Sequence, residues 1–150
     1  MRSRLPLAGI LIAILLASCG GRPGLYVSIG GETVPMVLGS VSQGTACSTS
    51  HGDAFPQLIP LTTVRLPTPL EIRFEAGQGA TAIRGWIYDR DAPSPAGGPI
   101  EEFSLPASRG AYETRSVLPG RTYDVTVNVE WSFVVTRGEE THLFRVRAEP

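Results

Sequence analysis

The chain has no lysine, only two cysteines, and no sustained helical periodicity after residue 18. All 13 basic residues are arginine, which we interpret as a result of GC-rich codon usage and not as a binding site. Residues 19–150 hold 11 arginines against 14 acidic residues, a formal charge of about −3, with no basic patch or stripe. This charge distribution argues against nucleic-acid binding.

The sequence also lacks apolar runs, apart from one at the N-terminus from Leu7 to Leu16. Arg2 and Arg4 precede this run and small residues follow it, which is the order typical of a secretory signal. The run is shorter than the roughly 20 apolar residues that a membrane-spanning helix needs. An uncleaved N-terminal membrane anchor stays as the alternative.

The end of the apolar run, Leu16-Ala17-Ser18-Cys19, resembles the bacterial lipobox of a leucine, two small residues and a cysteine. The resemblance implies cleavage between Ser18 and Cys19, removal of residues 1–18, and a diacylglyceryl group on the cysteine. Two or three acyl chains hold a protein firmly, because each buried methylene contributes about 0.8 kcal/mol. Residues 19–24 would then be a short tether.

The clearest structural signal is a period-two alternation near the C-terminus, where the odd positions of residues 123–135 are apolar. Such alternation predicts a long strand with one buried face. Residues 136–140 are polar and include Gly138, so we expect a turn there, followed by a partner strand over residues 143–148.

Shorter candidate strands share the same alternation or are bounded by glycine and proline. They are residues 25–29, 34–38, 70–76, 81–88, 100–105 and 112–118. Seven or eight short strands with 17 glycines and 13 prolines for turns predict an all-β, antiparallel β-sandwich. Residues 25–150 would form this single domain. Gly30-Gly31 is expected to be a hairpin turn.

The segment Leu118 to Val125 resembles the turn into strand F of fibronectin type III and immunoglobulin-like domains. The resemblance makes Tyr123 a candidate tyrosine corner, whose hydroxyl bonds to upstream backbone. The alternative is that Tyr123 is merely the first apolar residue of a strand. Trp86 and Trp131 are expected in the core, although tryptophans could also stack on a sugar or peptide.

Residues 39–63 are rich in serine, threonine and glycine and show no clear element, so a long loop is expected. Cys47, the cysteine left once Cys19 is acylated, lies in it. An incidental or buried thiol is the interpretation we favour, with a reactive thiol or an intermolecular disulfide as the alternatives.

Three residues of this loop, Cys47, His51 and Asp53, have the spacing C-x3-H-x-D and form a candidate binding loop. A zinc site needs four ligands, and the only further histidine is the distant His142, so no metal is predicted. Asp89-x-Asp91 could bind calcium, but turn initiation explains the pair better.

Catalytic and cofactor motifs are lacking as well. No G-x-S-x-G elbow and no phosphate-cradling glycine loop occurs in the sequence. We therefore predict no catalytic residue, no cofactor and no enzymatic activity.

The order of segments resembles a group of small bacterial lipoproteins in which a lipobox precedes V-x-(I/V)-G-G-x-x-V-P-x-x-L-G-(S/T). Val27 to Ser40 matches this pattern, and a tryptophan-containing strand and a C-terminal hairpin follow. The group often has two cysteines after the motif. Where the group would have its first cysteine, this chain has Val41-Ser42-Gln43, which implies that Cys47 lacks a partner. The resemblance brings no established reaction.

Together these patterns predict a membrane-anchored lipoprotein on the extracytoplasmic side of the cell membrane or outer membrane. Its expected partners are membrane lipid, through acylated Cys19, and an envelope protein bound by loops on a rigid scaffold. The alternative is a lipoprotein that binds a small ligand, either a glycan or a divalent cation.

Overall fold

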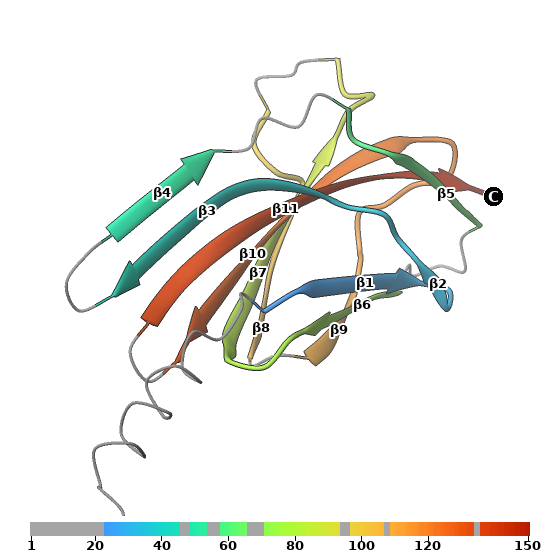
Figure 1. The fold of residues 1–150 in the computed structure, drawn as a ribbon. Coiled ribbons are helices and arrows are strands. Elements are labelled where there is room, and N and C mark those ends of the chain that lie inside the picture. The colour runs from blue at the N-terminus through green and yellow to red at the C-terminus, as the bar shows by residue number, and fades with distance from the viewer. Residues whose placement is uncertain are drawn as a thin grey trace, which may run out of the picture.

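Every regular element in the described part of the chain is a β-strand. The computed structural model describes residues 23–45, 49–53, 58–65, 71–93, 97–106, 109–133 and 136–150. Eleven strands in these ranges form two sheets that face each other (Figure 1). The predicted all-β sandwich is confirmed, although it has more strands than the seven or eight expected.

The smaller sheet contains four strands in the order β2-β1-β6-β9. Their bounds are β2 Glu32–Thr33, β1 Leu25–Ile29, β6 Glu71–Ala76 and β9 Arg109–Glu113. Gly30 and Gly31 connect β1 to β2 with φ values of 60° and 87°. Both angles are positive, as a type I′ hairpin requires, so the predicted turn is confirmed.

The larger sheet has the order β4-β3-β11-β10-β7-β8, and β5 pairs in parallel with β11. The strand bounds are β3 Val37–Thr45, β4 Thr49–Asp53, β5 Leu61–Arg65, β7 Ala80–Asp89, β8 Glu101–Pro106, β10 Thr122–Ser132 and β11 Thr136–Glu149. All other neighbouring strands in this sheet are antiparallel.

The connectivity supports the immunoglobulin and fibronectin-III-like architecture. Strands β1, β6 and β9 take the places of A, B and E, while β7, β8, β10 and β11 take those of C, C′, F and G. Strands β3 and β4 are inserted between A and B and pair beyond G, on the edge strand of the basic sandwich. Figure 1 shows them extending the large sheet past the area that the small sheet covers.

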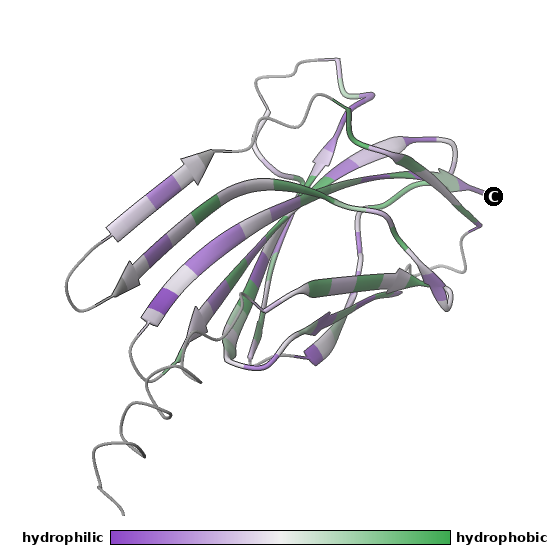
Figure 2. Ribbon diagram, in the orientation of Figure 1, coloured by the Kyte–Doolittle hydropathy of each residue, from purple (hydrophilic) through white to green (hydrophobic). Residues whose placement is uncertain are grey.

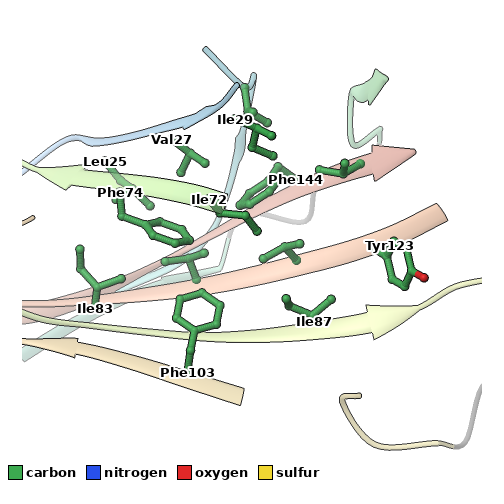
Figure 3. Close-up of a cluster of buried hydrophobic side chains, with 14 of the residues drawn as sticks. Leu25, Val27, Ile29, Ile72, Phe74, Ile83, Ile87, Phe103, Tyr123 and Phe144 are labelled. Atoms are coloured by element: carbon green, nitrogen blue, oxygen red, sulfur yellow. The ribbon is translucent and has the colours of Figure 1, made fainter. Parts of the chain in front are cut away.

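The core lies between the inner faces of the two sheets, and on β1, β6 and β10 buried apolar side chains alternate with outward ones (Figures 2 and 3). On β10 the burial pattern alternates strictly, which confirms the long strand predicted from its odd positions. Burial of apolar surface at about 25 cal/mol per Å² makes this cluster the main stabilising element. Its largest fully buried members include Tyr123, Phe74, Phe144, Ile72, Ile83 and Ile87.

The expected long loop over residues 39–63 is wrong. Most of this segment is strand, because β3 and β4 pair from Ser40↔Asp53 to Gly44↔Thr49, and β5 begins at Leu61. The paired parts of β3 and β4 carry mainly small polar side chains and have no alternating apolar face, so period two does not reveal them. Backbone pairing holds them in place instead, since β3 pairs with β11 and β4 pairs with β3.

The expected turn over residues 136–140 is also wrong. Ser132 pairs with Arg137, so β11 already begins at Thr136. The polar residues at the start of β11 lie between β10 and β3, where the ladder supplies the backbone partners. Polarity in this half of the strand therefore does not mark a turn.

Tyr123 forms the tyrosine corner, and this prediction is confirmed. Its hydroxyl accepts a hydrogen bond from the backbone N–H of Leu118 at 2.8 Å, and the residue is only 2% exposed. The intervening Gly120 has a φ of 82°, which permits the tight turn before β10. The ring thus fixes the connection between β9 and β10.

We expect Tyr123→Phe to lower the free energy of unfolding by about 1–2 kcal/mol, because the Leu118 N–H loses its acceptor. Urea unfolding followed by fluorescence measures this change. Tyr88→Phe is the matched control, since Tyr88 is 37% exposed, and should shift stability by less than about 0.5 kcal/mol. Equal effects of the two substitutions would contradict the role of the corner.

Candidate binding surface on the large sheet

The outer face of β7 carries the aromatic residues of the candidate site. Ile83, Gly85 and Ile87 point into the core, so Trp86 and Tyr88 alternate to the opposite face. Trp86 is only partly buried there, and the expectation that it belongs to the core is wrong. Trp131 was also expected to be buried in the core, and this prediction is confirmed because the residue is only 2% exposed.

Gly85 explains why the aromatic residue of β7 faces outward. A Cβ atom at Gly85 would lie 2.1 Å from the ring of Phe103 on β8. That ring fills the inner position and packs against Phe74 and Tyr112, with ring centroids 5.1 and 4.5 Å away. The two neighbouring strands therefore form a rigid base for the surface above them.

A shallow hollow of about 280 Å³ lies on this outer face between β7 and β8. Trp86 pairs with Glu102 and Arg84 pairs with Ser104, so these four side chains share one face around the hollow. Gly85 and Phe103 complete its lining. An aromatic ring, a guanidinium, a carboxylate and a hydroxyl thus surround one small space.

The arginines of this face are paired with carboxylates of β10. Arg84 Nη2 lies 3.0 Å from Glu130 Oε1. Further along the sheet, Asp124 accepts hydrogen bonds from Arg145 at 2.6 and 3.2 Å and from Arg90 at 3.0 Å. Exposed pairs of this kind stabilise the fold by at most about 1 kcal/mol, but they orient the guanidinium groups.

One buried carboxylate, Glu101 on β8, is 8% exposed and has a structural role. Its Oε1 accepts hydrogen bonds from the backbone N–H groups of Arg115, at 2.8 Å, and Ser116. Its Oε2 accepts the hydroxyl of Tyr112 at 2.6 Å. Glu101 thereby ties the connection between β9 and β10 to the large sheet.

The environment of Tyr112 predicts a pH dependence of stability. Burial, the hydrogen bond to Glu101 and the negative charge of that carboxylate raise the pKa of Tyr112 to about 12 from 10. The folded state therefore holds the phenol proton more tightly than the unfolded state. Its stabilising contribution is fully present below pH 10 and is lost as the pH rises toward 12.

We expect the free energy of unfolding of Tyr112→Phe to fall less steeply than that of the unmodified protein between pH 10 and 12. Urea unfolding at a series of pH values measures the difference between the two slopes. Identical slopes would contradict this account of Tyr112.

A second buried acidic residue, Glu140, pairs with His142 at 2.9 Å on the inner face of β11. Val127 and Val129 of β10 lie opposite the pair, and both are fully buried. Each polar partner satisfies the other inside the sandwich, as buried polar groups require.

The candidate loop residues are not brought together with His142. His51 is exposed on the edge strand β4, where it pairs with Ser42 on the outer side, while His142 faces inward. Asp53 ends β4 opposite Ser40. Cys47 lies outside the described residues, as do Ser18 and Cys19. Within the described ranges, no three histidine, cysteine or acidic residues are placed to share a metal ion.

Both aspartates of the D-x-D pair act in a turn. Asp89 Oδ1 accepts the Asp91 N–H at 2.9 Å, and its Oδ2 lies 2.9 Å from Arg121. Asp91 Oδ2 accepts the Thr122 N–H at 2.7 Å. These bonds support turn initiation, the interpretation that the sequence favoured.

The sequence did not reveal the polar part of the site. Arg84, Glu102 and Ser104 surround Trp86 only because β8 pairs with β7 in this register. The only signal along the chain is Gly85, which takes the inward position between Ile83 and Ile87. A glycine at such a position marks a place where a neighbouring strand supplies the core side chain.

No protein-family model, curated protein or solved structure matches this chain. Across the described ranges, no helix is both long and apolar enough to cross a bilayer.

Proposed function

We propose that this protein is a lipid-anchored, non-catalytic binding module of the bacterial cell envelope. Acylated Cys19 would hold it in the membrane, and the outer face of β7 and β8 would bind its partner. The observation that carries the proposal is the hollow beside Trp86, an outward aromatic residue surrounded by polar groups on a rigid sheet.

The position of the hollow is compatible with an anchor at Cys19. Leu25, at the start of β1, lies six positions after Cys19, and a fully extended segment of that length spans about 20 Å. Leu25 pairs with Ala76, next to the turn where β7 begins. Trp86 lies six residues along β7 from Ala80, about 20 Å farther from the anchored end.

The buried ionisable groups support the non-catalytic part of the proposal. Glu101 binds three donors of its own chain, and Glu140 binds His142 opposite the buried Val127 and Val129 of β10. Each of these groups therefore has a structural partner that accounts for it. The binding surface moves from the expected loop over residues 39–63 to the Trp86 face, because much of that segment is strand.

Membrane fractionation of the unmodified protein and Cys19→Ala tests the anchor. We expect the unmodified protein in the membrane fraction, with a mature N-terminus at a diacylated or triacylated Cys19 by mass spectrometry. Cys19→Ala should keep its signal uncleaved at that position and carry no acyl group. An unmodified Cys19, or cleavage elsewhere, would overturn the lipoprotein assignment.

A further inference from the structure

We propose that the hollow beside Trp86 binds an uncharged pyranose ring of a glycan chain in the cell wall. The inference deepens the proposed binding function, on which its biological setting rests, by assigning the ligand class. The hollow itself is a feature of the described residues and does not depend on the anchor.

The aromatic part of the site fits a chain of sugar rings. One face of a pyranose ring presents C–H groups that pack on an indole. A sugar can therefore stack on a tryptophan while its hydroxyl groups keep their hydrogen bonds. Trp86 and Tyr88 lie two residues apart on one face of β7, a separation of about 6.6 Å along the strand. Two aromatic rings at this spacing can contact successive sugars of one chain.

The polar part of the site fits sugar hydroxyls, which both donate and accept hydrogen bonds. Arg84 supplies donors, Glu102 supplies acceptors, and the hydroxyl of Ser104 supplies both. The cross-strand pairs Trp86↔Glu102 and Arg84↔Ser104 place all of them beside the indole. A purely apolar ligand would leave these groups without partners, at a cost.

Charge distinguishes a neutral sugar from other ligands. The hollow holds one guanidinium and one carboxylate, and Arg84 also pairs with Glu130 at 3.0 Å. The site therefore has no excess positive charge to attract a phosphate, a nucleic acid or an anionic headgroup. An uncharged N-acetylhexosamine or hexose unit matches this balance.

The size of the hollow also favours a single sugar ring. The hollow has about 280 Å³, below the range of roughly 300–1,000 Å³ typical of pockets that enclose drug-sized ligands. A stable protein partner would contact about 20–30 residues, far more than the six that line the hollow. A single ring of an extended chain, lying on the sheet at its β8 edge, fits these dimensions.

Two probes test the inference on the full-length mature protein in detergent micelles. One is sedimentation with purified peptidoglycan sacculi, and the other is titration with chitotetraose followed by tryptophan fluorescence and calorimetry. We expect binding of both probes by the unmodified protein. Trp86→Ala should weaken chitotetraose binding at least tenfold, while Trp86→Tyr should retain part of it.

The matched control is Tyr26→Ala, which removes a tyrosine that is 68% exposed on the opposite sheet. It should bind chitotetraose like the unmodified protein. Glu102→Gln keeps the shape of the side chain, and we expect it to weaken binding severalfold. Thermal unfolding of each variant shows that the fold is intact before its binding is compared.

The possible failures are distinct. Absence of binding to both probes, or equal binding by Trp86→Ala, overturns the glycan inference whatever the state of Cys19. Sacculus binding that persists in Trp86→Ala together with loss of chitotetraose binding also overturns it, because a different surface then contacts the wall. An unacylated Cys19 in a protein that still binds chitotetraose overturns the anchor and leaves the glycan site in place.

Discussion

Replacing Glu101 by alanine is expected to lower the free energy of unfolding by about 2–4 kcal/mol. The substitution removes the acceptor of three donors, the N–H groups of Arg115 and Ser116 and the hydroxyl of Tyr112. Hydrogen bonds to a charged acceptor contribute about 1.5–3 kcal/mol each, but water can reach part of this connection. The net loss is therefore smaller than the sum of the three bonds.

Urea unfolding of Glu101→Ala measures this loss, and two variants separate its causes. Glu101→Gln keeps an oxygen acceptor for the two N–H groups, so its loss should be clearly smaller. Glu102→Ala changes the exposed neighbouring residue and should alter stability by no more than about 0.5 kcal/mol. If Glu101→Ala costs no more than Glu102→Ala, the three hydrogen bonds do not stabilise the connection.

The framework of the sandwich could be predicted because its strands have one apolar face. On β6, Ile72 and Phe74 are buried while Arg73 is exposed, and on β10 the alternation runs through the whole strand. Tyr123 could be identified for a similar reason, since a tyrosine after Pro-Gly at the start of a strand is a local pattern.

The inserted strands could not be predicted, because pairing and not burial holds them. Ser40, Ser42 and Gly44 of β3 have no apolar partners at alternate positions. Their backbone groups bond to β11 and β4, an interaction that any small polar residue allows and that leaves no periodic pattern. The same reason explains why the polar start of β11 resembled a turn.

The candidate site could not be predicted because the sequence of β7 does not show which of its two faces is buried. Ile83 and Ile87 share one face, Trp86 and Tyr88 share the other, and both sets are apolar. The sequence of β7 alone does not decide which set faces the core. Gly85 decides it, but only through the ring of Phe103, which belongs to a different strand. Tertiary packing therefore selected the outward aromatic pair.

The second large effect is expected for Gly138→Ala, at about 2–3 kcal/mol of lost stability. A Cβ atom at Gly138 would lie 2.3 Å from the carbonyl oxygen of Ser42 and 2.6 Å from the ring of Trp131. The oxygen belongs to the backbone of β3, next to the residue that pairs with Gly138. Trp131 is buried and packs on Phe133 at 5.6 Å, so neither neighbour moves freely.

Relief of this contact requires β3 to move away from β11, which would also loosen β4. Gly138→Ala should therefore speed backbone amide exchange in β3 and β4 more than in β1 or β6, in addition to lowering the urea midpoint. Gly52→Ala is the matched control, because a Cβ atom at Gly52 on the edge strand meets no other atom within 4 Å. It should change stability by less than about 0.5 kcal/mol. Equal behaviour of the two alanine variants would show that the close approach of β3 to β11 does not constrain position 138.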